Sequence, residues 1–260
     1  MGARKYGCLV EERDDRDHHF PRRLTAKQLP DVHDFSGRCP RAYNQKTLGS
    51  CTAHSAAGGL HFTELEQDPE SVIEPARLFI YEMTLMLQGT PGQDVGSTNR
   101  DTLKALAKYG YCPEKLYPYL VKNFGHGGPD KAVRDAAAKQ RMMQLWYGRV
   151  NVTVDDICAA IAEDWPVTLG MPVYESFESR DTARTGKVVM PKDGERMLGG
   201  HSMLVVGYNR LKRVFIVRNS WDYTWGRNGY CEIPFEFALK YFRDLWAYKR
   251  VADAMNPLKS

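Results

Sequence analysis

The amino-acid sequence predicts an α+β protein built from two lobes. Helical patterns fill roughly residues 49–110, where apolar residues recur at helical spacing and glycines end the runs. Short segments rich in β-branched residues fill the second half, from about residue 166 onward. Helices followed by strands are typical of α+β proteins, in which the two kinds of element form separate parts of the molecule.

Four helices are predicted in chain order. The first, CTAHSAAGGLHFTELEQ, begins at Cys51; the second, PARLFIYEMTLMLQ, is ended by Gly89; the third, STNRDTLKALAKYG, is ended by Gly110. The fourth, TVDDICAAIAEDW, begins after Thr153, whose hydroxyl suits a helix N-terminus, and it stops before Pro166.

Four strands follow, and each is short and bounded by turn-forming residues: PVTLGMPV, SMLVVGY, RVFIVRNS and YCEI. A long polar loop, residues 174–199, separates the first two strands and is either a binding loop or a plain surface excursion. The prediction is therefore one domain over residues 31–260, with a helical lobe at about 45–125 and a sheet lobe at about 126–250.

The composition argues against several classes of protein. The 260 residues, 43% of them apolar, suffice for a large core, and a net charge of +4 with short, separated basic clusters does not favour nucleic-acid binding. The sequence contains no run of 18 apolar residues, which is the length that a membrane-spanning helix needs. The N-terminal stretch MGARKYGCLVEERDDRDHHF lacks the apolar core of a signal peptide. We expect neither nucleic acid nor membrane as a partner; a cytoplasmic or virion-packaged location both stay open.

The cysteines do not predict a metal centre. None of the six forms a C-x-x-C pair or a zinc-like spacing with histidine. The pair His18-His19 together with Cys8 is a weak alternative for metal binding. We expect no metal and no cofactor.

Cys51 is a candidate nucleophile because of its position. It lies directly after Gly49-Ser50 and before a predicted helix, where backbone N–H groups and the helix dipole would lower the pKa of its thiol. Gln45, six residues upstream, would add its side-chain amide to an oxyanion site. For each residue taken singly, the ordinary interpretation is the more common one: a free cysteine is usually a small buried apolar residue, and a loop glutamine is usually solvated.

His201 and Asn219 form the second candidate pair. His201 begins SMLVVGY and Asn219 follows RVFIVR, and the two are symmetric about Arg210. An antiparallel hairpin turning there would set them opposite each other, about 5 Å apart. Asparagine would then fix the tautomer and orientation of the histidine, as a general base requires. An ordinary polar rim at the base of a hairpin is the alternative.

Two segments resemble the papain-like cysteine peptidases. QKTLGSCTAHSA is similar to their nucleophile segment, and GGHSMLVVGYNRLKRVFIVRNSWDYTWGRNGY to their histidine and asparagine segment. The second similarity is the more specific, because several glycines, two tryptophans and both polar residues keep their order. The resemblance covers roughly residues 30–240 and is closest to the compact bacterial and giant-virus cathepsin-like branch.

The resemblance implies a papain-like two-lobe fold with the active site in the cleft between the lobes, and a thiol peptidase that acts on peptides or proteins. It implies Cys51 as nucleophile, His201 as general base and acid, Asn219 as the group that orients His201, and Gln45 in the oxyanion hole. Trp221 would cover the contact between His201 and Asn219. The further substrate-binding residues implied are Gly96, Ser97, Thr98, Asn99, Gly200 and Ser202.

The chain departs from the family pattern beside these residues. Leu48 stands where the family commonly has a disulfide-forming cysteine, Thr52 where an aromatic residue follows the nucleophile, and Asp222 where a glycine follows Trp221. None of these changes removes a catalytic group. Thr52 leaves open how the helix packs beside the site.

The N-terminal segment, residues 1–30, has two interpretations. Secreted relatives carry a long helical prodomain, and the fifty residues before Cys51 are too few for one. We expect residues 1–30 either to mask the cleft as a short propeptide-like segment or to bridge the lobes as a plain arm.

Two other functions remain open at this stage. One is an acyl-transfer enzyme that passes the thioester to an amine, and the other is a catalytically silent peptide-binding protein. A binding protein has no need for Gln45, Cys51, His201 and Asn219 together. The choice between endopeptidase and exopeptidase depends on the loop at residues 174–199.

Overall fold

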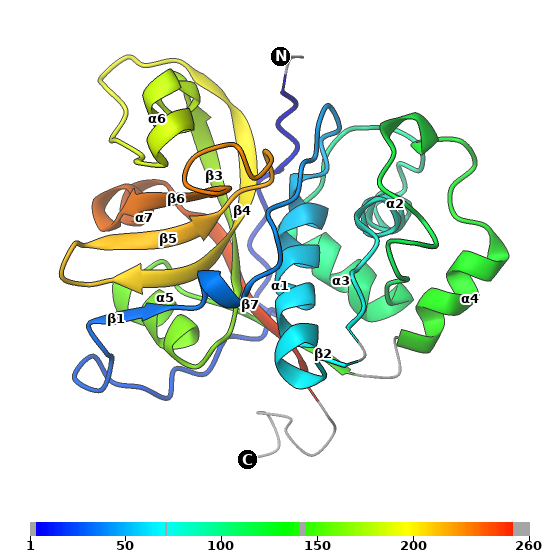
Figure 1. Ribbon diagram of the computed structural model, residues 1–260, viewed down its shortest axis with the longest axis horizontal. Helices are drawn as coiled ribbons and strands as arrows, with labels where there is room; N and C mark the ends of the chain where they lie inside the picture. Colours follow the sequence, from blue (N-terminus) through cyan, green and yellow to red (C-terminus); the bar gives the residue numbers. More distant parts are fainter. Residues whose placement is uncertain (1–3, 71, 141–143, 252–260) are drawn as a thin grey trace.

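The computed structural model describes residues 4–70, 72–140 and 144–251, which form two lobes side by side (Figure 1). One lobe is helical and the other contains the sheet. The helical lobe contains α1 (Cys51–Gln67), α2 (Arg77–Leu87), α3 (Asn99–Tyr109), α4 (Lys131–Gln140) and the 3-10 turn η2 (Val121–Asn123). Within the described residues, no helix is long and apolar enough to cross a membrane.

The named strands of the sheet lobe pair antiparallel, with strand order β2-β7-β3-β4-β5-β6 and β1 paired to β4. Its strands are β1 (Val32–Asp34), β2 (Gln144–Arg149), β3 (Val167–Tyr174), β4 (Met197–Asn209), β5 (Val214–Arg218), β6 (Tyr230–Pro234) and β7 (Arg243–Val251). Helices α5 (Val154–Ala162), α6 (Arg180–Thr185) and α7 (Phe235–Tyr241) and the turns η1 (Ser36–Arg38) and η3 (Glu175–Glu178) accompany it. The four predicted strands are confirmed as β3 to β6.

Polar caps and glycines bound the helices, as predicted for Thr153 and Gly110; the cap at Thr98 was not predicted. Thr98 and Thr153 cap α3 and α5, because each hydroxyl accepts a hydrogen bond from the backbone N–H three residues later. Gly110 ends α3 with a φ of 74°, a conformation that glycine adopts without strain. The predicted helices α1, α2, α3 and α5 are confirmed.

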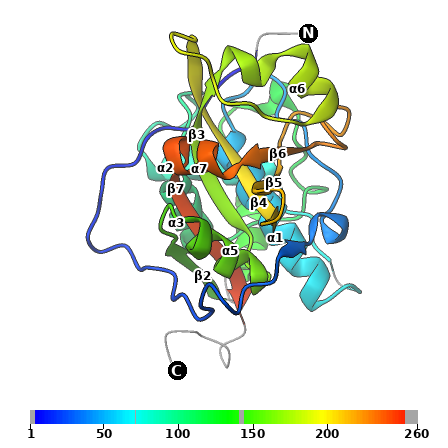
Figure 2. The same cartoon turned by 90° about the vertical axis from the view of Figure 1, so that its left-hand side faces the viewer.

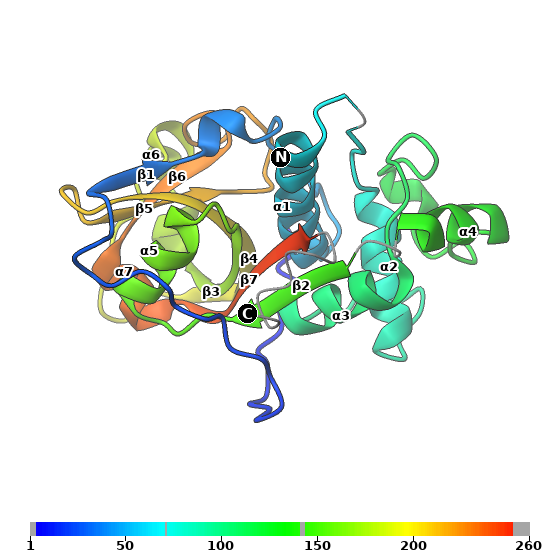
Figure 3. The same ribbon diagram turned by 90° about the horizontal axis from the view of Figure 1, so that it is seen from below.

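Helix α1 runs along the junction of the two lobes, as the view from below shows (Figure 3). Its glycine pair makes this close approach possible. A Cβ on Gly58 would collide with the guanidinium of Arg218, and one on Gly59 would collide with the hydroxyl of Tyr248. The small residues of AHSAAGG therefore bring the start of α1 tightly against β4 and β7.

The boundary between the lobes differs from the predicted one. Ala137 of α4 is buried in a cluster with Phe79 and Met83 of α2 and Ala105 of α3. Helix α4 therefore belongs to the helical lobe, which continues past residue 126. The sequence showed no strong helical periodicity here, because only Ala137 of the helix is fully buried.

The hairpin of β4 and β5 also differs in register. The structure pairs Leu204 with Arg218 and, beyond a bulge, Gly207 with Ile216. The predicted pairing symmetric about Arg210 is therefore wrong by two residues, because a bulge and a wider turn shift the ladder. His201 and Asn219 are diagonal neighbours, and their side chains still meet.

The N-terminal arm, residues 4–30, crosses both lobes. Its first residues descend between α1 and the sheet (Figure 1), and the following stretch swings out from the body before it returns (Figure 2). The backbone N–H of Phe20 donates to the carbonyl of Arg149, and the Phe20 ring packs against Trp146 and Trp165 at centroid distances of 5.7 and 5.5 Å. Both ends of the outward stretch are thus attached to the body.

Candidate active site

The His201–Asn219 contact is the polar centre of the site. His201 Nε2 lies 2.8 Å from Asn219 Oδ1, and both residues are buried. Asn219 Oδ1 also accepts a hydrogen bond from the N–H of Ser220, so this atom is the acceptor and His201 Nε2 carries the hydrogen. The lone pair of neutral His201 therefore lies on Nδ1, which has no hydrogen-bond partner among the described residues.

Aromatic rings cover this contact. Trp221 stacks on His201 with a centroid distance of 4.9 Å and an interplanar angle of 26°. Trp225 and Phe177 pack edge-on against Trp221 at 5.4 and 5.3 Å. The rings exclude water, which strengthens the buried hydrogen bond of His201.

Cys51 is the first residue of α1, as predicted, and is completely buried. Backbone N–H groups of Gly7, Thr52 and Ser202 lower the pKa of its thiol, but burial outweighs them and raises that pKa. Burial also lowers the pKa of His201 to about 4. The predicted lowering of the Cys51 pKa is therefore wrong for this covered state, in which both groups are neutral near pH 7.

Gln45 is held on both sides of its amide. Its Oε1 accepts a hydrogen bond from Ser220 Oγ at 2.6 Å, and its Nε2 donates to the carbonyls of Leu48 and Lys5 at 3.0 and 3.2 Å. Ser220 adjoins Asn219 in the chain, so one backbone segment orients both the histidine partner and the glutamine. The amide nitrogen presents a donor to a peptide carbonyl, that of Lys5.

The arm fills the cleft as an extended peptide. The N–H of Cys8 donates to the carbonyl of Gly200 at 3.0 Å, and that of Leu9 donates to the carbonyl of Ser97 at 3.0 Å. The N–H of Ser97 donates to the carbonyl of Gly7 at 2.8 Å. Residues 7–9 thus pair with both walls, and the pairing with Ser97 is parallel.

Glycines set the width of the cleft. A Cβ on Gly7 would overlap the carbonyl of Gly49, one on Gly96 would overlap the carbonyl of Gly7, and one on Gly200 would overlap the carbonyl of Cys8. The N–H of Gly96 donates to the hydroxyl of Tyr81 and not to the peptide. Two residues were predicted to offer backbone groups to a peptide. Ser97 does so, whereas Gly96 makes room for the peptide because it has no side chain.

Side chains of the arm hold it at the catalytic end. The Arg4 guanidinium lies 4.0 Å from the centre of the Trp221 ring and 3.6 Å from the carboxylate of Glu178. Lys5 Nζ lies 2.7 Å from Asp94 Oδ2. The Tyr6 ring meets His201 edge-on at 6.3 Å. The arm therefore covers His201 and Trp221 as well as the sulfur of Cys51.

The wall beyond Cys8 is polar. Asn99 Oδ1 accepts hydrogen bonds from Ser202 Oγ at 2.7 Å and Thr168 Oγ1 at 3.2 Å, while Asn99 Nδ2 donates to the carbonyl of Asp244. Cys8 Sγ lies against Gly170, 3.2 Å from where a Cβ would stand. The Thr98 hydroxyl accepts a hydrogen bond from the backbone N–H of Asp101 and caps α3, and its role at the pocket stays a prediction.

The sequence did not indicate Thr168, Gly170 or Asp244 as part of this wall. The first two lie inside a strand that reads as apolar, and Asp244 lies in β7, which was not predicted. The only sequence signal for Thr168 and Gly170 is that a threonine and a glycine interrupt the apolar run PVTLGMPV.

The residues that depart from the family pattern are accommodated. Thr52 Oγ1 lies 2.5 Å from Ser97 Oγ, so a hydrogen bond between buried hydroxyls joins α1 to the cleft wall. Leu48 packs with Leu78 and Tyr119 in a small apolar cluster. Asp222 has a φ of 79°, the left-handed conformation that a glycine would adopt, and its carboxylate accepts a hydrogen bond from Asn44.

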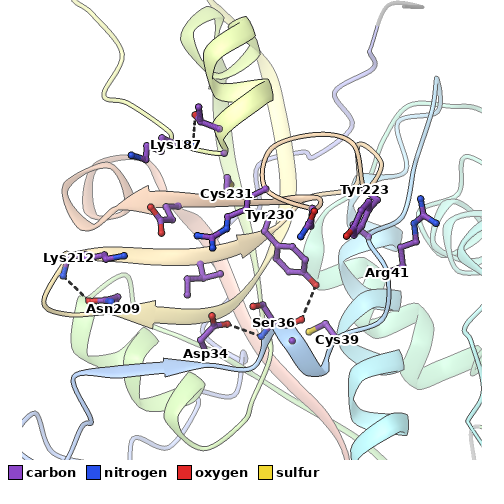
Figure 4. Close-up of a pocket in the computed structure, with 18 of the residues that line it drawn as sticks. Asp34, Ser36, Cys39, Arg41, Lys187, Asn209, Lys212, Tyr223, Tyr230 and Cys231 are labelled. Atoms are coloured by element: carbon purple, nitrogen blue, oxygen red, sulfur yellow. Dashed lines mark hydrogen bonds between the residues drawn. The ribbon is translucent and has the colours of Figure 1, made fainter.

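A second hollow lies on the sheet lobe, with a volume of about 600 Å³ (Figure 4). Cys39, Tyr223 and Tyr230 are among the residues that line it, and none of the predicted catalytic or substrate-binding residues does. In the described part of the chain, no three histidine, cysteine or acidic side chains are grouped to hold a metal ion, so Cys8, His18 and His19 do not form such a group.

The chain is similar to known peptidases over most of its length. A family model described as papain family cysteine protease matches residues 29–238. A peptidase C1-like protein of Acanthamoeba polyphaga mimivirus is 36% identical, over 96% of this chain and 88% of its own. Peptidase 1 of the mite Psoroptes ovis is 26% identical, over 88% of this chain and 68% of its own.

Solved structures agree with the sequence comparison. Xylellain, a cysteine protease from Xylella fastidiosa, is similar with a TM-score of 0.86 and 28% identity, over 97% of this chain and 99% of its own. Procathepsin L 3 of Tenebrio molitor shares the fold at 16% identity and a TM-score of 0.64, over 91% of this chain and 75% of its own. The predicted two-lobe fold and the similarity to bacterial and giant-virus enzymes are thereby confirmed.

Proposed function

Because the chain belongs to the papain family of cysteine proteases, we propose that this cysteine peptidase hydrolyses peptide bonds through a thioester on Cys51. His201 acts as general base and acid, Asn219 orients it, and Gln45 stabilises the oxyanion. The observation that carries the proposal is the convergence of three contacts: His201 Nε2 on Asn219 Oδ1, Gln45 Nε2 on a peptide carbonyl, and backbone N–H groups on the sulfur of Cys51.

The reaction follows from the placement of these groups. His201 Nδ1 takes the proton of the Cys51 thiol, and the sulfur attacks the carbonyl carbon of the substrate. The negative oxygen that forms is held by Gln45 Nε2 and the backbone N–H of Cys51. His201 gives its proton to the leaving amine as the C–N bond breaks. It then removes a proton from water, which attacks the thioester, releases the acid and regenerates the thiol.

Substrate binding would use the groups that the arm now occupies. Ser97 offers its backbone N–H and carbonyl to an extended peptide, and Gly200 offers its carbonyl. Asn99 and Ser202 border the polar pocket that holds Cys8, and Thr98 supports that wall as the cap of α3. Trp221 lies beneath the part of the peptide that meets Arg4 in this state.

Residues 4–9 would act as a mask that must leave before a substrate can enter. They take the hydrogen-bonding groups of Ser97, Gly200 and Gln45, and Cys51 and His201 are fully buried beneath them. A segment that satisfies these groups competes directly with a peptide substrate. Several of the similar solved structures are proforms of cysteine proteases, which supports this interpretation.

Hydrolysis of a fluorogenic peptide library by the full chain tests the proposal, with Cys51→Ala as the control. We expect cleavage that is abolished by the substitution, and free carboxylic acid as the product. Adding a primary amine separates hydrolysis from acyl transfer, because an acyl-transfer enzyme would yield the amide as the main product. Cleavage that persists in the Cys51→Ala variant would overturn the proposal.

A further inference from the structure

A buried charge cluster fastens the arm just beyond the cleft. The carboxylate of Glu11 has no solvent exposure, and it accepts hydrogen bonds from the backbone N–H of Arg100 at 2.7 Å, from Arg149 Nη2 at 2.8 Å and from Trp246 Nε1 at 3.1 Å. The backbone N–H of Glu11 in turn donates to Asp244 Oδ2 at 3.2 Å. Glu11 therefore contacts α3, the end of β2 and β7 at once.

Asp17 of the arm completes the cluster. Its Oδ2 accepts hydrogen bonds from Arg100 Nη2 at 2.7 Å and Arg149 Nε at 3.0 Å, and its side chain is only 7% exposed. Arg149 Nη1 also lies 3.6 Å from Asp244 Oδ1. Farther out along the arm, Arg16 Nη2 lies 2.7 Å from Asp14 Oδ2, and the Arg16 side chain is exposed.

The cluster carries one negative charge too many for a buried site. It contains three carboxylates, those of Glu11, Asp17 and Asp244, and two guanidiniums, those of Arg100 and Arg149. Without the arm, the body alone presents two guanidiniums and one carboxylate. Docking of the arm thus changes the cluster from one excess positive charge to one excess negative charge, and an unbalanced charge is costly to bury.

We propose that this cluster is a proton-linked latch on the mask: the arm binds more firmly when one buried carboxyl carries a proton, and it opens more often as the solution becomes less acidic. The latch rests on the proposed function, since it regulates access to the cleft in which Cys51 acts. The latch adds to that function a specific site, the buried cluster around Glu11, and the direction in which pH changes the opening of the mask.

The pKa of Glu11 sets the direction and the range. Burial, followed by the repulsion of Asp244, raises the pKa of Glu11 to about 7, from the ordinary value of 4.5 that a glutamate has in a solvated arm. The same burial raises the pKa of Asp244. Docking therefore takes up a proton between about pH 4.5 and pH 7. The docking constant is largest in acid, falls by up to tenfold per pH unit across this range, and no longer depends on Glu11 above it.

The rate at which a peptidyl epoxide labels Cys51 measures how often the mask opens. Full-length chains carrying Glu11→Gln and the matched control Glu12→Gln are compared with the wild type at pH 5, 6, 7 and 8. Glutamine imitates the protonated form of Glu11, whereas the Glu12 side chain is exposed. Taking the ratio of wild-type to variant rates removes the pH dependence of the labelling chemistry itself.

We expect the ratio of the wild-type rate to the Glu11→Gln rate to be only about fourfold at pH 5, to rise by up to tenfold per pH unit to about pH 7, and then to level off. The ratio with Glu12→Gln should stay flat. A flat Glu11→Gln ratio would overturn the latch. The Gly7→Ala variant opens the mask by steric overlap and therefore tests the masked nucleophile separately from the latch. If Gly7→Ala is labelled at Cys51 while the Glu11→Gln ratio stays flat, only the latch fails. If Gly7→Ala is not labelled, the masked nucleophile itself is wrong.

Discussion

Gly7 of the arm lies directly against the carbonyl group of Gly49, so that a β-carbon on Gly7 would overlap the Gly49 oxygen. Gly49 precedes Cys51 by two residues, at the turn into α1. The arm can therefore pass over the nucleophile only because residue 7 has no side chain. Backbone atoms form the contact on both sides, so neither partner can move aside cheaply.

Gly7→Ala is expected to activate the peptidase by weakening the mask. Overpacking against fixed backbone typically costs about 1–3 kcal/mol, and 1.4 kcal/mol corresponds to about tenfold in the docking constant. We expect kcat/KM for peptide hydrolysis to rise by about tenfold or more. Gly37→Ala is the matched control, because a Cβ at Gly37 meets nothing within 4 Å. Equal rates for the two variants would argue against the mask.

Asn219→Ala is expected to lower kcat without a comparable change in KM. The substitution removes the acceptor 2.8 Å from His201 Nε2 and leaves a buried N–H without its partner. Such a loss costs about 1–3 kcal/mol, which corresponds to roughly a ten- to hundredfold fall in rate. The measurement is made in the Gly7→Ala background, with Asn209→Ala at the end of β4 as control. A change confined to KM would contradict an orienting role for Asn219.

Acid is expected to destabilise the fold through its buried histidines. Burial lowers the pKa of His54 to about 3 and of His201 to about 4, whereas the unfolded chain has ordinary values near 6.5. The unfolded state therefore binds protons first, and the free energy of unfolding falls as the pH drops from 6.5 towards 4. Each histidine contributes up to about 1.4 kcal/mol per pH unit, against which the raised pKa of Glu11 acts in the opposite direction.

Urea unfolding of His54→Gln isolates one of these contributions. The difference in unfolding free energy between the wild type and this variant should change by up to about 1.4 kcal/mol per pH unit between pH 6.5 and pH 4. His54 lies outside the cleft contacts, bonded through Nδ1 to the carbonyl of Ser50 at 2.9 Å. A difference that stays constant with pH would show that His54 has an ordinary pKa.

Substitutions at Ser202 and Thr98 are expected to have different effects. Ser202→Val adds bulk beside Asn99 and removes a 2.7 Å hydrogen bond, so it should change which side chain the pocket prefers. Thr98→Val removes the cap of α3 and should cost about 1 kcal/mol of stability while the preference is kept. Profiling both variants with a peptide library distinguishes these outcomes. An unchanged preference in Ser202→Val would place the pocket elsewhere.

Local signals predicted much of the fold and the contact between His201 and Asn219. Thr153 marked a helix start, Gly110 marked a helix end, and the branched residues of β3 to β6 marked strands, whereas the cap at Thr98 was not predicted. The register of the β4–β5 hairpin could not be predicted, because a bulge between Val205 and Gly207 leaves no mark in the composition. Helix α4 was not predicted, because a helix with a single fully buried residue shows no helical spacing of apolar residues.

Contacts between distant residues account for what the sequence could not predict. Nothing near Gly7 in the chain indicates that it meets Gly49, and nothing near Glu11 indicates that it meets Arg149 and Asp244. The pKa of Cys51 was predicted from the start of α1 alone. Burial of the sulfur raises its pKa and so reverses that prediction.

The most direct test of an assembled but covered peptidase site is the mapping of a peptidyl epoxide adduct by mass spectrometry. The reagent is applied to the wild type, to Gly7→Ala and to Gly7→Ala combined with His201→Ala. We predict a single adduct on Cys51 that forms slowly in the wild type and faster in Gly7→Ala, and that is nearly abolished when His201 is also replaced. An adduct on another cysteine, or equal labelling with and without His201, would contradict the account.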